Sequence, residues 1–235
     1  MAGAMTDHSA WFEGGEFTSD WTSMHFDVWA KLLEPLRDRP VDILEVGAFE
    51  GRSAIFFLEY LPLSRIVCID RFKSSFDPGY DVRFRRNTRR FGRRIEAIRA
   101  DSSTALQSLL PNARRFDVIY IDGSHARDDV LIDSLLCWRL LRVGGIMIWD
   151  DYELDMTPYD GPREAIDQAL NLYQGAFEEL HKAGQVIIRK TRERRSFFLA
   201  PPRLNRITLQ RFFRGRLGAA RTPANLLRVL LGRLG

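Results

Sequence analysis

The sequence predicts an α/β fold in which helices cover both faces of a mostly parallel sheet. Short apolar segments alternate with helical patterns through the middle of the chain. The apolar segments are nearly continuous, which is typical of parallel strands that are buried on both faces. After them, "FEELHKAGQVIIRK" (177–190) has the pattern of two strands joined by Ala-Gly, so one antiparallel strand is expected at the sheet edge.

Each expected element has its own local signal. Strands are expected at "VDILEVG" (41–47), "RIVCID" (65–70), "RIEAIRAD" (94–101), "FDVIYID" (116–122) and "VGGIMIWDD" (143–151). Helices are expected between them at 52–60, 102–110, 127–141 and 162–176. The third has apolar residues at 130, 131, 135, 136, 140 and 141, which is helical spacing. The fourth carries Pro162 near its first turn, where a missing N–H costs nothing.

The composition is that of a globular protein in a reducing compartment. Of the 235 residues, 45% are hydrophobic and 28% charged, which is ordinary for a chain with a sizeable core. Cys68 and Cys137 both lie in apolar segments, so we expect packed thiols rather than a disulfide. No signal peptide and no membrane-spanning run is visible, so a cytoplasmic location is expected.

The positive charge is concentrated at the end of the chain. The net charge is +4, and residues 196–235 contain eight arginines and no acid. The chain therefore divides into an N-terminal segment (1–30) that contributes to the site cover, a main domain (31–195) and a basic amphipathic extension (196–235). Two short helices in this extension could pack on the protein's own body, lie on an anionic membrane surface or join a partner subunit.

Acidic residues follow the expected strands at the points where ligands bind in such sheets. In open α/β sheets, ligands bind beyond the carboxyl ends of the strands. An acid at one strand end could be a helix cap, but the pattern here repeats over five strands. The acids concerned are Glu45, Asp70, Asp101, Asp122, Asp150 and Asp151.

The first strand–helix turn has the features of a cofactor site. "LEVGAFEGRS" contains an E-x-G-x-x-x-G pattern, and its glycines allow the backbone to approach a ligand closely. The spacing differs from the dinucleotide G-x-G-x-x-G pattern, which disfavours an NAD-linked enzyme. Asp70 could accept hydrogen bonds from both hydroxyls of a ribose, and Asp101 with Ser102 could reach an adenine edge. Tight packing without a ligand is the alternative.

These segments, in this order, resemble the class I S-adenosylmethionine-dependent methyltransferases over roughly residues 21–190. The resemblance implies a Rossmann-like sheet of seven strands with the last one antiparallel, which agrees with the expected hairpin. It also implies that Glu45, Gly47 and Gly51 line the methionine part of the cofactor. By the same resemblance, the ribose would bind Asp70, and the adenine would bind Asp101 and Ser102.

Three further acids indicate a metal site. Asp122 ends the fourth strand, and Asp150 with Asp151 ends the fifth. Neighbouring parallel strands lie about 4.8 Å apart, so these carboxylates are expected to meet. Because like charges repel, a hard divalent cation such as Mg²⁺ would resolve the cluster. The alternative is that Asp122 caps the next helix and the acidic pair is a solvated loop.

"IDGSH", "GG" and "DDY" together resemble a metal-dependent subgroup, the macrolide-sugar O-methyltransferases and cephalosporin-hydroxylase-like proteins. The resemblance implies that Asp122, Asp150 and Asp151 hold Mg²⁺ or another divalent cation. It implies that His125 is the general base, with Asp122 also in the catalytic and cofactor-binding sets. For His125, a helix-start histidine that bonds to backbone is the alternative. His25 is interpreted as structural.

The expected function is S-adenosylmethionine-dependent O-methylation of a small molecule, with Mg²⁺ assistance. Chelation favours an acceptor with adjacent oxygens, and a sugar or glycoside fits this. The alternatives are a metal-free methyltransferase for RNA or protein and a non-catalytic cofactor-binding assembly protein. A nucleic-acid partner is disfavoured, because no Asn-Pro-Pro-Tyr motif occurs. The arginine-rich segment 83–94 is interpreted as a solvated helix face with Phe84 and Phe91 directed inward.

Overall fold

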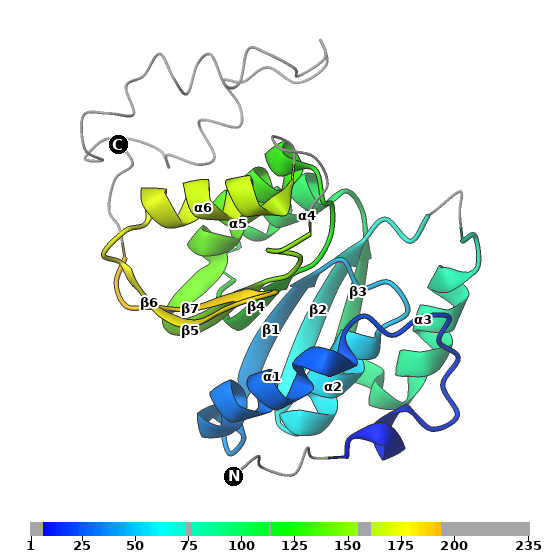
Figure 1. Cartoon of the computed structure of the whole chain (residues 1–235). Coiled ribbons are helices and arrows are strands. Elements are labelled where there is room, and N and C mark those ends of the chain that lie inside the picture. Colours follow the sequence, from blue (N-terminus) through cyan, green and yellow to red (C-terminus); the bar gives the residue numbers. More distant parts are fainter. Residues whose placement is uncertain (1–6, 74–76, 113, 155–160, 194–235) are drawn as a thin grey trace.

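A computed structural model of the chain describes residues 7–73, 77–112, 114–154 and 161–193 (Figure 1). The basic extension predicted at 196–235 lies outside these residues. Within the described part, no helix has the combination of length and apolar character that crossing a membrane requires.

Seven strands form one sheet in the order β3-β2-β1-β4-β5-β7-β6. Their bounds are β1 Val41–Val46, β2 Ser64–Asp70, β3 Ile95–Arg99, β4 Phe116–Ile121, β5 Leu141–Trp149, β6 Phe177–Lys182 and β7 Val186–Lys190. Strands β1 to β5 pair in parallel, and β7 is antiparallel to both β5 and β6. The mostly parallel seven-stranded sheet is thus confirmed. The antiparallel strand lies one place inside the edge, because β6 occupies the edge itself.

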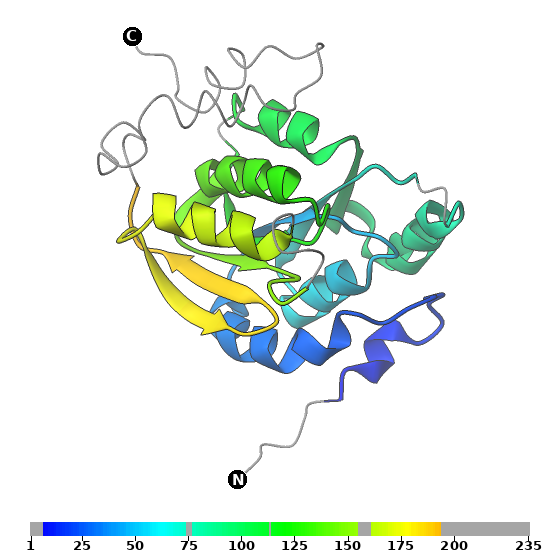
Figure 2. The same ribbon diagram turned by 45° about the horizontal axis from the view of Figure 1, so that its top comes forward.

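Helices cover both faces of this sheet, as the strand–helix alternation predicts. One face carries α1 (Phe26–Leu33), α2 (Arg52–Tyr60) and α3 (Tyr80–Thr88). The other carries α4 (Ser102–Leu109), α5 (Arg127–Leu140) and α6 (Pro162–Leu172) (Figure 1). Figure 2 shows α4, α5 and α6 side by side over the sheet, with α1 and α2 beneath it.

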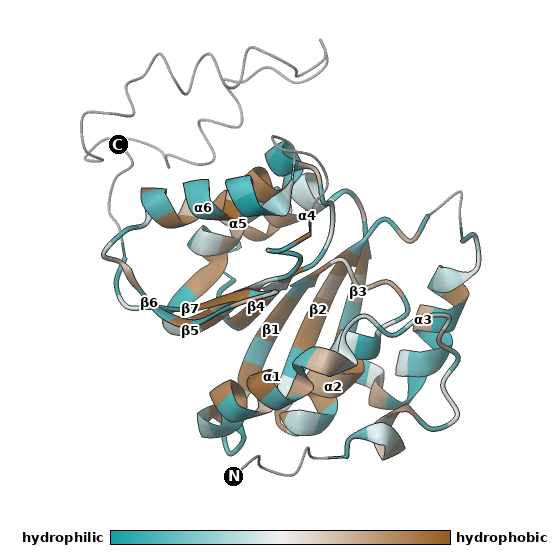
Figure 3. Cartoon of the chain, in the orientation of Figure 1, coloured by the Kyte–Doolittle hydropathy of each residue, from teal (hydrophilic) through white to brown (hydrophobic). Residues whose placement is uncertain are grey.

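The central strands are apolar on both faces because both are covered. Leu44 and Val46 pack under α4 and α5, while the alternate residue Ile43 packs against α2. All six residues of β4 are buried. Figure 3 shows the strands as largely hydrophobic and the outer helix faces as mixed or hydrophilic. Both cysteines are free and buried, so the prediction of packed thiols is confirmed.

The arginine-rich segment does not form the single helix that was expected. Helix α3 ends at Thr88, and a 3₁₀ helix follows over Arg89–Arg94 with Gly92 at φ 53°. The backbone therefore bends away before β3 begins. Phe84 and Phe91 are both buried, as predicted for the inward side chains.

Candidate active site

The turn after β1 touches the end of β4, and a glycine makes this contact feasible. Gly47 has φ +88°, and a Cβ atom on it would lie 1.8 Å from the carbonyl oxygen of Asp122. The amide of Asp122 in turn donates to the carbonyl of Val46 at 2.8 Å. The expected cofactor turn and the expected metal ligand are therefore direct neighbours. Gly51, also with positive φ, is the N-cap residue of α2.

The side chain of Glu45 lies in the protein interior beneath this turn and is not exposed to solvent. Its carboxylate is fully buried, where it accepts hydrogen bonds from the hydroxyl of Ser53 and from Cys68 Sγ at 3.1 Å. Burial raises the pKa of Glu45 to about 7. The side chain therefore ties β1 to α2 and β2, and its assignment to the methionine part of a cofactor stays a prediction.

Asp70 organises the backbone around the same turn. Oδ2 accepts from the amides of Ala48 and Phe49, both at 3.0 Å. Oδ1 accepts from the amide of Phe72 at 2.7 Å and from the hydroxyl of Tyr80 at 2.8 Å. Asp70 thus sits at the end of β2 as predicted, with hydrogen-bonding capacity that the protein itself already uses.

Asp101 and Ser102 begin helix α4 on the adjacent side of the sheet. Asp101 is the N-cap residue, and its carbonyl accepts from the amide of Ala105 at 3.0 Å. The Ser102 hydroxyl bonds to Asp133 of α5, a carboxyl that is only 2% exposed. Burial raises the pKa of Asp133 to about 7. The adenine-binding role of Asp101 and Ser102 remains a prediction.

The ends of β4 and β5 bring together three side chains with metal-ligating atoms. Asp122, His125 and Asp151 each offer one such atom, and these atoms all lie within 4.8 Å of one another. Nε2 of His125 lies 2.9 Å from Oδ2 of Asp151. This hydrogen bond raises the pKa of His125. Burial, followed by the nearby charges of Asp150 and Asp151, raises the pKa of Asp122 well above its ordinary value.

Asp150 joins this cluster through a residue that was not predicted, Tyr120. The hydroxyl oxygen of Tyr120 lies 2.8 Å from Oδ2 of Asp122 and in hydrogen-bond contact with Oδ2 of Asp150, so its single hydrogen is shared between the two acids. Oδ1 of Asp150 accepts from the amide of Asp151 at 2.9 Å. The predicted set therefore separates into Asp122 and Asp151, which share His125, and Asp150, which is linked to Asp122 by a tyrosine. A tyrosine inside a largely apolar, buried strand gave no sequence signal for this role.

His25, interpreted from the sequence as structural, also lies beside the acids. Its Nε2 is 3.8 Å from Oδ1 of Asp150, and its ring stacks on Trp29. Burial lowers the pKa of His25. Trp29 is itself held by a hydrogen bond from Nε1 to Gln185 at 2.7 Å. No sequence spacing could have found this contact, because His25 comes from a segment that precedes the first strand.

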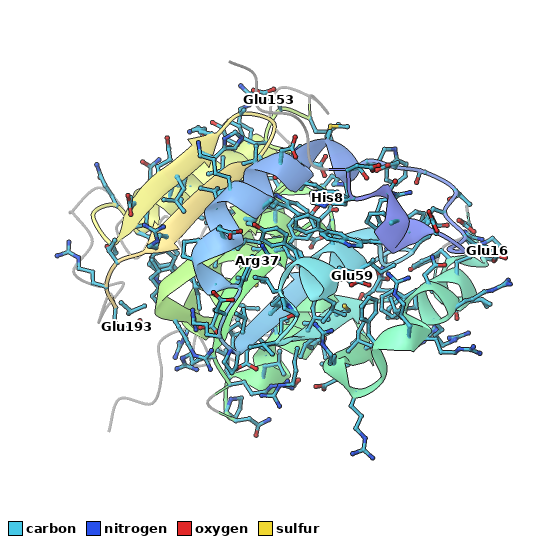
Figure 4. The ribbon with its side chains drawn as sticks, turned by 90° about the horizontal axis from the view of Figure 1, so that it is seen from below. His8, Glu16, Arg37, Glu59, Glu153 and Glu193 are labelled. Carbon is cyan, nitrogen blue, oxygen red and sulfur yellow. The ribbon has the colours of Figure 1, made fainter. Side chains whose placement is uncertain are left out.

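The N-terminal segment continues from His25 across the cofactor turn. The amide and hydroxyl of Thr18 donate to the buried carboxylate of Glu50, at 2.8 and 2.9 Å. Trp21 stacks on Phe49 with ring centroids 5.6 Å apart. Figure 4 shows His8 between α1 and α2, and Glu16 beside α3. The described part of this segment therefore packs on the turn between β1 and α2, and the cover role of residues 1–30 stays a prediction.

Part of this chain is similar in sequence to known methyltransferases. The family model described as a methyltransferase domain matches residues 44–152, which include the turn between β1 and α2 and the acids at the ends of β1 to β5. A curated protein of Streptomyces antibioticus, L-olivosyl-oleandolide 3-O-methyltransferase, is 28% identical over 173 residues. An uncharacterised protein of Acanthamoeba polyphaga mimivirus is 24% identical over 137 residues. The chain spans 41% and 60% of the lengths of these two relatives, respectively.

Solved structures share the fold. The methyltransferase MycE of the mycinamycin pathway, in complex with Mg and SAH, aligns with a TM-score of 0.57 at 18% identity. The alignment covers 78% of this chain and 53% of MycE. An O-methyltransferase from Bacillus cereus in complex with SAH also aligns with a TM-score of 0.57, at 20% identity, covering 74% of this chain and 84% of that one.

Proposed function

We propose that this chain, a class I S-adenosylmethionine-dependent methyltransferase, transfers a methyl group to a hydroxyl of a sugar or glycoside with the assistance of Mg²⁺. One observation carries the proposal. The ligand atoms of Asp122, His125 and Asp151 converge within 4.8 Å, and the backbone of Asp122 touches the glycine turn at Gly47. A metal-assisted acceptor site and a cofactor turn would therefore share one edge of the sheet.

The cofactor would occupy the carboxyl ends of β1, β2 and β3. The residues assigned to this role from the sequence lie at or just after the ends of the first four strands. The Glu45 carboxylate is the one that is buried beneath the turn. MycE and the Bacillus cereus relative are described as complexes with SAH, the demethylated form of the donor. The assigned residues are Glu45, Gly47, Gly51, Asp70, Asp101, Ser102 and Asp122.

The donor set fits a divalent cation. Carboxylate oxygens suit Mg²⁺, and the raised pKa of Asp122 shows that its negative charge is poorly compensated by the protein. Asp122 and Asp151 would hold the ion, while Asp150 would complete the predicted set through Tyr120. When bound, the ion would lower the pKa of an acceptor hydroxyl and orient it.

His125 would take the proton that leaves the acceptor. The hydroxyl oxygen forms a bond to the methyl carbon while the C–S bond breaks, and its electron pair stays on sulfur as a thioether. The hydroxyl proton passes to Nδ1 of His125, because Nε2 lies 2.9 Å from Oδ2 of Asp151 and donates its own hydrogen to that carboxylate. This hydrogen bond holds the imidazole ring in the site.

The sugar acceptor rests on the relatives. One curated relative is named for methylation of an olivosyl sugar, and MycE is also described in complex with mycinamycin VI. A cytoplasmic location stays a prediction. Membrane contact or oligomerisation through residues 196–235 also stays a prediction, because those residues lie outside the described part.

Methyl-donor turnover against glycosides and catechols, with and without Mg²⁺, tests the function. We expect turnover of a glycoside that EDTA abolishes and Mg²⁺ restores. Calorimetry should detect binding of S-adenosylmethionine but no binding of NAD. Full activity in EDTA would reject the metal role, and no binding of S-adenosylmethionine would reject the whole proposal. Asp150→Asn should abolish turnover while donor affinity is kept, whereas Asp128→Asn, in a partly exposed ion pair with Arg127, should retain both.

His125→Ala tests the base separately. Loss of a general base typically costs at least about 100-fold in rate, so we expect a fall of that size in kcat. The affinity for S-adenosylmethionine should stay within about three-fold, because the imidazole bonds to Asp151 and not to the cofactor turn. An unchanged kcat would show that another group accepts the proton.

A further inference from the structure

A second hollow lies at the amino ends of the central strands, opposite the carboxyl ends that carry the candidate active site. It is a groove of about 610 Å³ whose lining includes Asp42 of β1, Glu96 of β3 and Phe116 of β4. Its remaining polar lining is arginine from six positions. These are Arg65, Arg93, Arg94, Arg114, Arg115 and Arg142.

The two carboxylates of the groove are already engaged by some of these arginines. Glu96 accepts from Arg114, with Nη2 to Oε2 at 3.1 Å. Asp42 is shared, with Arg142 Nη2 at 3.0 Å and Arg65 Nη2 at 3.3 Å. Neither carboxylate is therefore free to neutralise the arginines that remain.

Three guanidinium groups of the groove form no ion pair with a carboxylate among the described residues. Arg94 is fixed by backbone carbonyls, through Nε to Ser64 at 3.0 Å and Nη2 to Leu58 at 2.6 Å. Arg115 donates to the carbonyl of Arg114 at 2.9 Å, and Arg93 has no side-chain hydrogen bond within the same part of the chain. Carbonyl partners hold a guanidinium in place but leave its charge uncompensated.

Such a cluster is costly without an anion. Like charges that converge on a concave surface repel one another, and the low-dielectric wall concentrates their field. The lining also includes the buried apolar side chains Ile43, Ile66 and Phe116, which supply such a low-dielectric wall. Arginine forks match the oxygens of phosphate in paired, charge-assisted hydrogen bonds.

We propose that this groove binds a ligand with two or more linked phosphate groups. One phosphate would not reach arginines that come from the beginnings of β2, β3, β4 and β5. The site would not touch the reacting atoms, because ligands of the catalytic edge bind at the other ends of the same strands. It is therefore a second site, and it is independent of the proposed methyl transfer.

Binding to the full-length protein tests the proposal, with tripolyphosphate as the probe and inorganic phosphate beside it. The groove variant is Arg93→Gln with Arg115→Gln, which removes two unpaired charges. The matched control is Arg85→Gln with Arg189→Gln, which removes the same charge from exposed pairs with Asp81 and Glu178. Both variants keep the basic extension, so any anion binding by residues 196–235 is unchanged.

We expect tripolyphosphate to bind more tightly than inorganic phosphate and to weaken about ten-fold or more in the groove variant, since charge-assisted contacts are lost. The control should stay within about two-fold, because exposed ion pairs contribute little. Equal binding by both variants would place the anion elsewhere and overturn the proposal. A short single-stranded RNA is tested in the same way. If the groove variant lost RNA binding but bound tripolyphosphate as before, the groove would be a nucleic-acid surface and the proposal would be overturned.

Vesicles identify the source of the phosphates. Phosphatidylcholine vesicles with and without a polyphosphorylated inositol lipid are sedimented with each variant. Lipid-dependent sedimentation that only the groove variant loses would support the site and assign it to a membrane headgroup. Tripolyphosphate binding in the groove with no such sedimentation would also support the site and assign it to a free phosphorylated molecule.

Discussion

The hydroxyl of Tyr120 lies between two carboxylates that would otherwise face each other. Asp122 and Asp150 follow β4 and β5, which pair in register with Ile121 opposite Trp149. Tyr120 is fully buried, and its ring packs on Trp29 with centroids 5.0 Å apart. Because this packing fixes the ring, it also fixes the position of the hydroxyl. The separation of the two acids is therefore set by packing on the face of the sheet that α1 and α2 cover.

Tyr120→Phe should weaken divalent cation binding, because the two acids lose the donor that positions them. Groups that orient metal ligands typically contribute 10- to 100-fold in affinity, so we expect Mn²⁺ to bind about ten-fold more weakly. Titration of Mn²⁺ followed by electron paramagnetic resonance measures this without any turnover. Tyr80→Phe is the matched control, since it removes a hydroxyl from Asp70 in the same way. Equal Mn²⁺ affinities in the two variants would contradict the positioning role.

At the residue scale, the sequence predicted the acids better than their partners. Asp122, Asp150 and Asp151 were expected to meet because they follow neighbouring strands, and the ligating atoms that converge are those of Asp122, Asp151 and His125. Tyr120 and His25 were not predicted. A tyrosine in an apolar strand has the pattern of a core residue, and the contact of His25 depends on how a distant segment packs.

At the element scale, the turn between β1 and α2 depends on a glycine for two reasons. Gly47 has φ +88°, and the space for its Cβ is filled by the backbone of Asp122. Gly144 has nearly the same φ, +85°, but nothing lies within 4 Å of its Cβ position. Substitution of Gly144 therefore tests the positive φ alone, whereas substitution of Gly47 tests the positive φ together with the close approach of the Asp122 backbone.

Gly47→Ala should destabilise the protein far more than Gly144→Ala. The left-handed conformation alone costs about 1–2 kcal/mol, which is the loss expected for Gly144→Ala. Gly47→Ala adds an overpacking cost of about 1–3 kcal/mol, so we expect a total of about 2–5 kcal/mol. Denaturant unfolding of both variants measures the difference. Equal losses would show that the turn can move away from β4.

The contact between α4 and α5 contains a carboxyl whose ionisation opposes folding. Asp133 is 2% exposed, and burial raises its pKa from 3.8 to about 7. Between these two values, the folded protein keeps a proton that the unfolded chain releases. The free energy of unfolding therefore falls as pH rises from about 4 to about 7, and the full cost is present above that window.

Asp133→Asn should remove this cost. The shift corresponds to about 4 kcal/mol at most, so the variant should be more stable than the original protein at pH 8 by up to that amount. Near pH 4 the two should unfold alike, because the buried carboxyl is then protonated and neutral. Thermal unfolding at both pH values measures the effect. A stability gain that is the same at pH 4 and pH 8 would contradict the assignment to ionisation.

Most elements of the sheet and its helices could be predicted, because burial on both faces imposes continuous apolar strands. Two elements differed, each for its own reason. Helix α1 (Phe26–Leu33) precedes the first strand, so it lies outside the strand–helix alternation from which the other helices were predicted. The arginine-rich segment bends at Gly92, where a positive φ ends helical geometry.

At the scale of the whole molecule, the sheet separates charge along its strands. The carboxyl ends gather the acids of the candidate active site, while the amino ends gather the arginines of the groove. The acids could be predicted, since each follows a strand. The arginine groove could not, because its members converge only once the strand order β3-β2-β1-β4-β5 is known.

The N-terminal segment is attached to the turn between β1 and α2 by hydrogen bonds to Glu50. Glu50, 1% exposed, accepts from the amide and hydroxyl of Thr18 and from Arg83. Glu50→Gln leaves one oxygen where the carboxylate offered two, and it removes the charge. Hydrogen bonds to charged groups contribute about 1.5–3 kcal/mol, so the segment should open more often.

We therefore expect amide hydrogen exchange in residues 16–25 of Glu50→Gln to accelerate about ten-fold or more, while exchange in β4 stays unchanged. If the segment covers the acceptor, KM for the acceptor should rise together with this opening. Arg86→Gln is the control, since it removes an exposed ion pair from the same segment, at Glu16. Such pairs contribute at most about 1 kcal/mol, so exchange should change little. Fast exchange with an unchanged KM would separate the segment from the acceptor and leave it as a structural strap alone.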